Sequence, residues 1–322
     1  MKKKILITGS SGFLGSRLAF FLKDNYDLLL PTHSELNISH EEAVKAYLME
    51  HRPDLVLHCA ALSNTWFCEQ HPEESHRVNV QGTVRVAKAC KFIGAKLVFM
   101  SSDQVYNGTP TPGALKEEEL VQPVNVYGRH KLEAEQRARW NLPEAVGLRL
   151  TWMYDLPDCG MKLNSNILVN LQNAFREGKT MQVATHEFRG VTYVWDVVKN
   201  MEKTFSLPGG IYNFGATNAL NSHALFLKAA ELMSLPHPAA LILPDEERFR
   251  EQDRNLTMDC ALIRNHGILF PDSVEGIREA LLRPFRTKSP SSKCILNNQF
   301  HPVLYFLEKS TETDFRSLHT SP

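Results

Sequence analysis

Tyr127 and Lys131 lie four residues apart in a segment with the pattern of a helix, residues 125–140. This spacing places the phenol and the ammonium group on one face of the helix. A nearby ammonium favours the phenolate and lowers the pKa of a tyrosine from about 10 toward neutral. Such a tyrosine can donate a proton when a carbonyl is reduced and accept one in the reverse reaction. Because the same pair also occurs on solvated helix faces, its meaning depends on the elements around it.

Ser102 follows an apolar run, residues 97–100, which we expect to be a buried strand. Its hydroxyl could hydrogen-bond a substrate carbonyl oxygen and orient it toward Tyr127. A turn in which Ser102 and Asp103 end the strand is a second interpretation, and it is compatible with the first.

Three glycines follow a short apolar strand near the start of the chain. Gly9 can make the tight turn out of the strand, and Gly12 allows the backbone to approach a pyrophosphate. Gly15 allows the next helix to pack closely on the sheet. The N–H groups of Phe13 and Leu14 would then point at an anion. An ordinary strand–turn–helix is the alternative, but the strand before the turn and the apolar helix after it favour dinucleotide binding.

Strand and helix patterns alternate through residue 150. The expected strands are residues 5–7, 26–30, 55–59, 97–100 and 146–150, and the expected helices after the first are 41–50 (with Ser39 as N-cap), 72–93 and 125–140. This alternation predicts an α/β fold with a doubly wound parallel sheet, the Rossmann type. Ligands bind at the carboxyl ends of strands in such sheets, so Gly9, Ala60 and Ser102 should lie around one site.

The alternation loosens beyond residue 152, where we expect helices over 163–177, 195–205 and 222–233 and a strand over 211–214. We predict an NAD(P)-binding Rossmann domain made of residues 1–152 and about 190–207. The predicted smaller substrate-binding lobe comprises residues 153–189 and 208–285. We expect residues 286–322 to be a poorly ordered tail because their composition is polar and rich in Ser, Lys and Thr.

Composition narrows the class of protein. The 36 basic and 36 acidic residues balance, so neither nucleic acid nor an anionic membrane is favoured as a partner. Six cysteines occur without a CxxC pair, and those in apolar segments, Cys59 and Cys90, indicate buried, reduced thiols in the cytoplasm. The sequence has no stretch near the length of a membrane span, and its lysine-rich start lacks the features of a signal peptide. The 13 histidines have no metal-ligand spacing, so we expect no metal site.

Together these motifs resemble the extended short-chain dehydrogenases/reductases and, within that group, the dTDP-4-dehydrorhamnose reductase family. The resemblance covers roughly residues 3–282. The segments that carry it are Gly9–Gly15, His58–Ala61, Val78–Thr83, Ser101–Tyr106, Tyr127–Lys131 and Arg149–Tyr154, with a weaker match over Arg254–Asp259.

The resemblance implies that Ser102, Tyr127 and Lys131 form the catalytic set and that Lys131 also holds the nicotinamide ribose. Ser102, Asp103 and Trp152 would face the sugar. The other residues that it places along the cofactor are Gly9, Ser11, Gly12, Phe13, Leu14, Gly15, Asn37, Ile38, Ala60, Ala61 and Ser63. The implied cofactor is NADPH or NADH, and the implied reaction is hydride transfer to the ketone of a 4-keto nucleotide sugar with Tyr127 as proton donor.

Several residues depart from the family pattern. Asn37 stands where the family usually has an aspartate, which weakens one cofactor contact. Residues 32–34 contain neither the acid that favours NAD nor an arginine for the phosphate of NADP, so cofactor preference is open. Gln104 replaces an aromatic residue and cannot serve as the acid or base of a dehydratase. The stretch 186–190 replaces a more typical Asp-Gln-x-Gly, which leaves the identity of the sugar open.

Two other functions share these motifs. One is a non-catalytic NAD(P)-binding regulatory subunit similar to the methionine adenosyltransferase β subunit, which can retain the catalytic set. The other is a nucleotide-sugar epimerase, which would consume no net NAD(P)H. Arg189 and Arg254 could bind a diphosphate or form surface salt bridges, and the chain could be a monomer or a homodimer.

Overall fold

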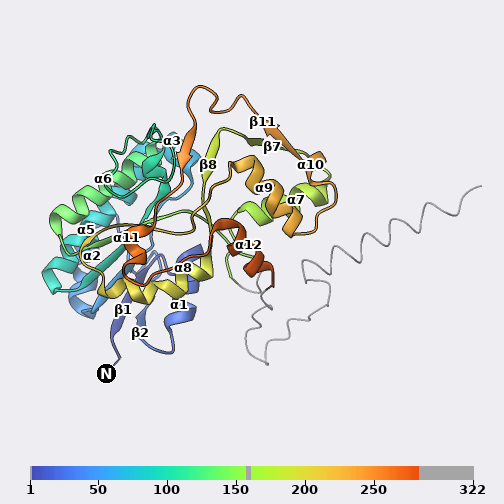
Figure 1. Cartoon of the computed structure of the whole chain (residues 1–322). Coiled ribbons are helices and arrows are strands. Elements are labelled where there is room, and N and C mark those ends of the chain that lie inside the picture. The colour runs from blue at the N-terminus through green and yellow to red at the C-terminus, as the bar shows by residue number, and fades with distance from the viewer. Residues whose placement is uncertain (1, 157–160, 283–322) are drawn as a thin grey trace, which may run out of the picture.

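A six-stranded parallel sheet forms the centre of the computed structural model, which describes residues 2–156 and 161–282 (Figure 1). The strand order is β10-β5-β4-β3-β1-β2. Their bounds are β1 Lys4–Thr8, β2 Asp27–Leu29, β3 Leu55–His58, β4 Lys96–Ser102, β5 Val146–Leu150 and β10 Gly210–Phe214. The order reverses between β1 and β3, so the predicted doubly wound Rossmann sheet is confirmed. The predicted tail lies outside the described residues.

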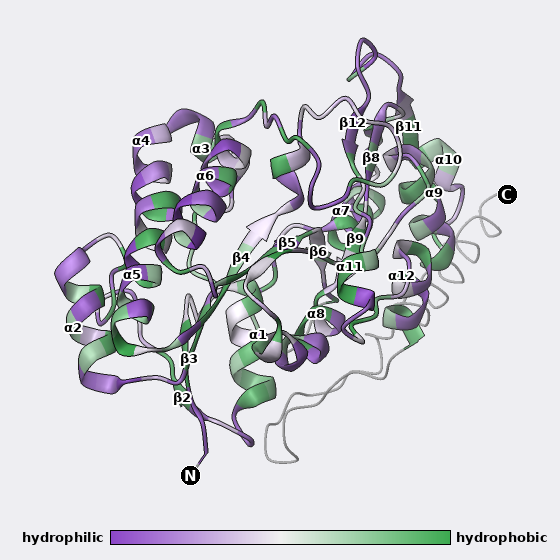
Figure 2. Ribbon diagram, turned by 60° about the vertical axis from the view of Figure 1, so that its left-hand side comes forward, coloured by the Kyte–Doolittle hydropathy of each residue, from purple (hydrophilic) through white to green (hydrophobic). Residues whose placement is uncertain are grey.

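Helices cover both faces of this sheet because alternate residues of each buried strand point to opposite sides. The helices are α1 Phe13–Leu22, α2 Glu41–His51, α5 Thr83–Ile93, α6 Val126–Asn141 and α8 Val194–Met201. Ile5 and Ile7 of β1 belong to the same apolar cluster as α1 and α8, whereas Leu6 belongs to the cluster that contains α2, α5 and α6. Figure 2 shows hydrophobic residues along α1 and mainly hydrophilic colour on the outer turns of α2.

The predicted helix over 72–93 is present without a break, but its middle is π-helical. It is made of α4 Pro72–Ser75, a π-helical segment, His76–Gly82, and α5, and a short helix that was not predicted, α3 Thr65–Gln70, precedes it. The side chain of Asn79 in the π-helical segment accepts from the N–H of Leu62 and donates to its carbonyl, both at 2.9 Å. These two bonds fix the loop after β3, and π-helical segments often coincide with functional sites.

The predicted helix cap at Ser39 is wrong by one residue. Helix α2 has His40 as its N-cap, without a side-chain cap hydrogen bond. Ser39 lies one residue earlier, in an Asx turn in which its N–H donates to the Asn37 side chain at 2.9 Å.

The remaining strands form three two-stranded parallel pairs. They are β6 Trp152–Tyr154 with β9 Val191–Tyr193, β7 Met181–Ala184 with β11 Ile242–Asp245, and β8 Glu187–Arg189 with β12 Arg254–Leu256. The accompanying helices are α7 Ile167–Glu177, α9 Ser222–Leu232, α10 Pro238–Leu241, α11 Ala261–Arg264 and α12 Ser273–Leu282. Strands β7, β8 and β11 lie beside α7, α9 and α10 and beyond the edge of the main sheet (Figure 1).

One predicted domain boundary needs correction at β10. The division at residue 208 assigns this strand to the smaller lobe, but residues 210–214 pair with β5 as the edge of the main sheet. A parallel edge strand needs a crossover, which α8 supplies on the same face as α1. The rest of the division into a Rossmann domain and a substrate-binding lobe stays a prediction.

In the described part of the chain, no helix is both long and apolar enough to span a membrane. Four cysteines in these residues are free thiols: Cys59, Cys68, Cys90 and Cys260. Cys90 is buried as predicted, whereas Cys59 is only partly buried at the carboxyl end of β3.

Candidate functional site

The glycine-rich turn lies between β1 and α1 and has the geometry that anion binding requires. Gly9 has a φ of +66°, and the N–H of Gly12 donates to the Gly9 carbonyl at 2.9 Å. A Cβ on Gly9 would lie 2.8 Å from the backbone of Ala60, and a Cβ on Gly15 would collide with the Gly9 carbonyl oxygen. The first turn of α1 receives no side-chain cap. Its N–H groups at Phe13 and Leu14 therefore fit a pyrophosphate.

Two of the predicted strand ends lie side by side, since a Cβ on Gly9 would meet the backbone of Ala60. Ala61 is partly buried, and Ser11 and Ser63 are exposed. Asn37 is partly buried in its Asx turn, whereas Ile38 is buried in the core beneath α5. The Ile38 side chain is therefore not exposed to a ligand.

Ser102, Tyr127 and Lys131 are buried at the carboxyl end of β4, each with an exposed fraction of 8% or less. Ser102 ends β4, and Tyr127 and Lys131 lie one turn apart at the start of α6. The side chain of Asn125 caps this helix by accepting from the Gly128 N–H. The Lys131 ammonium donates to the Met100 carbonyl at 2.8 Å and lies 5.7 Å from the centre of the Tyr127 ring.

The pKa of Tyr127 is raised above its ordinary value, so the predicted lowering is wrong for the protein alone. Burial is the main cause, and the charge of Asp103 adds to it. The ammonium is engaged with Met100 instead of the phenol. Burial also lowers the pKa of Lys131 to about 8, against the opposing charge of Glu135. Tyr127 is therefore protonated at neutral pH, which is the form that a general acid needs.

Two arginines from the neighbouring strands β8 and β12 reach the residues after β4. Arg189 donates to Asp103 at 3.0 Å, and Arg254 donates to Gln104 at 2.8 Å and to Glu187 at 2.9 Å. Their side chains are only 16% and 20% exposed, so these are not surface salt bridges. Both guanidinium groups are already paired within the protein, and sequence spacing gave no signal for these partners.

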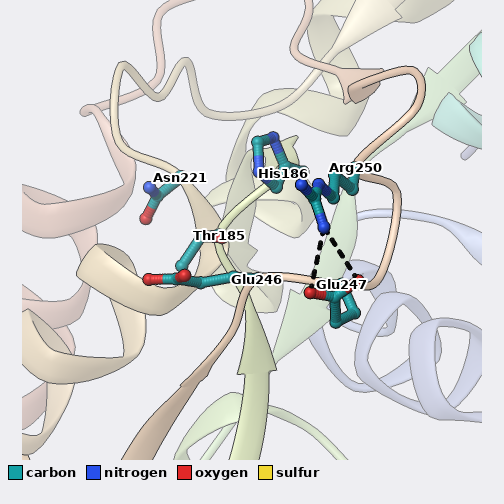
Figure 3. Close-up of a pocket in the computed structure, with 6 residues that line it drawn as sticks. All are labelled: Thr185, His186, Asn221, Glu246, Glu247 and Arg250. Atoms are coloured by element: carbon teal, nitrogen blue, oxygen red, sulfur yellow. Dashed lines mark hydrogen bonds and ion pairs between the residues drawn. The ribbon is translucent and has the colours of Figure 1, made fainter.

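A cavity of about 480 Å³ opens at the turn between β7 and β8. Figure 3 shows that Thr185 and His186 face it from this turn, while Glu246, Glu247 and Arg250 come from the segment after β11. The sixth lining residue, Asn221, caps α9. Arg250 pairs with Glu247, and His186 pairs with Asp253 at 2.8 Å. The walls of this cavity come from three distant segments, so no local pattern in the sequence predicts it.

His58 lies between the glycine-rich turn and the π-helical segment. Thr83 donates its hydroxyl proton to the Asn79 carbonyl at 2.7 Å, so it accepts from Nε2 of His58 at 3.1 Å. Nδ1 is then the acceptor for the Thr8 hydroxyl at 2.8 Å. This arrangement needs a neutral imidazole. Burial, followed by the charge of Lys131, lowers the pKa of His58 from 6.5 to about 3.

This pKa shift predicts acid-sensitive stability. Between pH 6.5 and about 3 the unfolded chain binds a proton at this position that the folded protein does not, so stability is complete above pH 6.5 and falls with decreasing pH. The expected contribution is about 1.4 kcal/mol per pH unit, or about 2 kcal/mol between pH 6.5 and 5. Urea unfolding at both pH values should show that His58→Gln removes most of this loss. His40→Gln, at an exposed position, serves as the control, and an equal slope in His58→Gln would contradict the prediction.

Across residues 2–156 and 161–282, no three His, Cys, Asp or Glu side chains form a group that could hold a metal ion.

The fold and this site define a Rossmann-type α/β protein with the architecture of extended short-chain dehydrogenases/reductases. The chain belongs to the RmlD substrate binding domain family, whose sequence profile matches residues 2–244. It is 28% identical to methionine adenosyltransferase 2 subunit beta of Xenopus laevis over 296 residues, which cover 87% of each chain. It is 30% identical to dTDP-4-dehydrorhamnose reductase of Mycolicibacterium smegmatis over 199 residues, 62% of this chain and 59% of the relative.

The crystal structure of dTDP-4-dehydrorhamnose reductase from Bacillus anthracis in complex with NADP has the same fold. It matches with a TM-score of 0.77 and 24% sequence identity, covering 88% of this chain and 98% of that one.

Proposed function

We propose that this protein is an NAD(P)H-dependent reductase of a 4-keto nucleotide sugar. The observation that carries the proposal is the burial of Ser102, Tyr127 and Lys131 at the carboxyl end of β4. The glycine-rich turn follows the carboxyl end of β1 in the same parallel sheet. A raised pKa keeps Tyr127 in the proton-donating form. The family of the chain and the NADP complex of the Bacillus anthracis reductase support the same function.

The residues present fit a nicotinamide dinucleotide. The uncapped first turn of α1 would hold the pyrophosphate, and side-chain-free positions in the turn leave room for its approach. Lys131 would hold the nicotinamide ribose. A bound reduced nicotinamide would supply the hydride. Tyr127 would donate a proton to the carbonyl oxygen of the substrate. Ser102, whose hydroxyl donates to Asp103 in the protein alone, would turn that proton to the same oxygen and orient it.

The sugar would lie against Asp103 and Trp152, and the nucleotide end would enter the cavity at the β7–β8 turn. His186 lines this cavity and lies three residues before Arg189, a strand distance of about 10 Å. That separation suits a ligand with a sugar at one end and a nucleoside at the other. Carboxylates of Glu246 and Glu247 in the cavity can accept hydrogen bonds from ribose hydroxyls or a base.

A cofactor-binding test follows from Gly15. We expect Gly15→Ala to weaken the binding of NADH and NADPH at least about tenfold, because the added Cβ would push α1 away from the Gly9 carbonyl. Fluorescence titration of the bound reduced cofactor measures this. The control is Gly94→Ala, where a Cβ meets nothing within 4 Å although φ is +76°. Equal binding by both variants would contradict the assignment of the turn.

The function is tested by following NADH and NADPH oxidation with a panel of 4-keto nucleotide sugars. Oxidation that depends on one sugar would support the reductase and identify the preferred cofactor at once. Conversion of the sugar without net oxidation would instead indicate an epimerase. The cytoplasmic location expected from the cysteines stays a prediction, as does the choice between a monomer and a homodimer.

A second candidate is a non-catalytic, cofactor-binding subunit of another enzyme. The alignment with methionine adenosyltransferase 2 subunit beta favours it, since that match extends over 87% of each chain. Turnover and the recovery of a partner protein distinguish the two candidate functions. A subunit would bind NADPH or NADH without turnover on any sugar and would be recovered from cells in a fixed ratio with an enzyme partner.

A further inference from the structure

Arg189 links the small strands to the catalytic region through two side chains that were predicted to face the sugar. Its Nη2 donates to Oδ2 of Asp103 at 3.0 Å, and the Asp103 side chain is only 2% exposed. Its guanidinium carbon lies 5.2 Å from the centre of a Trp152 ring. A single arginine therefore holds both a buried carboxylate and an aromatic face, the two partners that a guanidinium suits best.

A second hydrogen bond connects Asp103 to Ser102. The Ser102 hydroxyl donates its one proton to Oδ1 of Asp103 at 3.0 Å and accepts from the Gln104 N–H at 3.2 Å. The rotamer of Ser102 is thus set by the carboxylate, and the position of the carboxylate is set by Arg189. A buried carboxylate without its cation would be free to turn or to take up a proton.

We propose that Arg189 is a positioning residue that fixes Asp103 and Trp152 and, through Asp103, the hydroxyl of Ser102. The proposal rests on the function proposed above only in that Ser102 serves the reaction. The contact itself exists without substrate, so it can be tested without turnover.

The first test measures how accessible Trp152 is. Acrylamide quenching of tryptophan fluorescence is recorded for each protein and for the same protein carrying Trp152→Phe. The difference between the two gives the quenching of Trp152 alone. We expect Arg189→Met to raise the quenching constant of Trp152 about twofold or more because the stacked guanidinium is lost. Asp103→Asn should act in the same direction, since Asp103 holds the guanidinium in place. Arg264→Met, which removes a half-exposed arginine paired with Asp259, is the control and should change nothing. Unchanged quenching in Arg189→Met would overturn the proposal.

The second test uses turnover. Arg189→Met should lower kcat about tenfold or more while cofactor affinity stays constant, because Ser102 is misplaced and the glycine-rich turn is not. Arg189→Lys should recover part of kcat, since an ammonium can pair with Asp103 but cannot stack as a planar fork. An unchanged kcat in Arg189→Met would also overturn the proposal. If the wild type reduces no substrate, the reductase function fails, and the quenching result alone decides whether Arg189 positions these residues.

Discussion

Replacing Tyr127 with phenylalanine is expected to lower turnover of a 4-keto nucleotide sugar by about 10²–10⁴-fold, the usual contribution of a positioned general acid. Only the hydroxyl is lost, and the ring stays in a site where Tyr127 is 8% exposed. The Lys131 ammonium donates to the Met100 carbonyl, so its position does not depend on the phenol. Binding of NADH and NADPH should therefore stay within about twofold of the wild type.

The measurement is NADPH or NADH oxidation at saturating sugar, beside a fluorescence titration of the cofactor. Tyr47→Phe is the matched control, because Tyr47 lies on α2, against the apolar cluster on the opposite side of β1 from α1. Retention of a tenth or more of wild-type turnover in Tyr127→Phe would assign the proton to another donor. Loss of cofactor binding together with turnover would show that the substitution had damaged the site and not only the acid.

The second large effect concerns stability and the buried pair of Arg149 and Glu135. Their side chains are 5% and 3% exposed, and Arg149 donates from Nε and Nη2 to the two carboxylate oxygens at 3.0 and 2.8 Å. Its remaining nitrogen donates to the Tyr106 hydroxyl at 2.7 Å. Arg149→Met would leave the Glu135 carboxylate buried without its ion-pair partner. We expect the free energy of unfolding to fall by about 3–5 kcal/mol.

Urea unfolding at pH 7 measures this loss. Arg137→Met is the control, because Arg137 pairs with Glu133 on the same helix but the two side chains are 48% and 37% exposed. That variant should lose at most about 1 kcal/mol. Adding Glu135→Gln to Arg149→Met should recover part of the loss, since the unpaired charge is then gone. A loss below 1 kcal/mol in Arg149→Met would mean that water reaches the carboxylate in the folded protein.

The sequence determined the features that depend on neighbouring residues. The apolar run before Gly9 and the glycine spacing specified a strand, a tight turn and a helix, and the structure contains all three. The four-residue spacing of Tyr127 and Lys131 specified a shared helix face. Alternation of strands and helices predicted the parallel sheet, because a parallel connection requires a crossover whatever the side chains are. These conclusions need only periodicity and backbone geometry.

Tertiary structure decided what depends on contacts between distant segments. Residues 211–214 read as a strand in the sequence, but pairing with β5 assigned that strand to the main sheet. The pKa of Tyr127 follows from burial and from Asp103, so the spacing to Lys131 could not give even its direction. Arg189 is 86 residues from Asp103 along the chain, yet their atoms are in hydrogen-bond contact. Burial and charge pairing act through space, and a local pattern of residues does not encode which segments fold against one another.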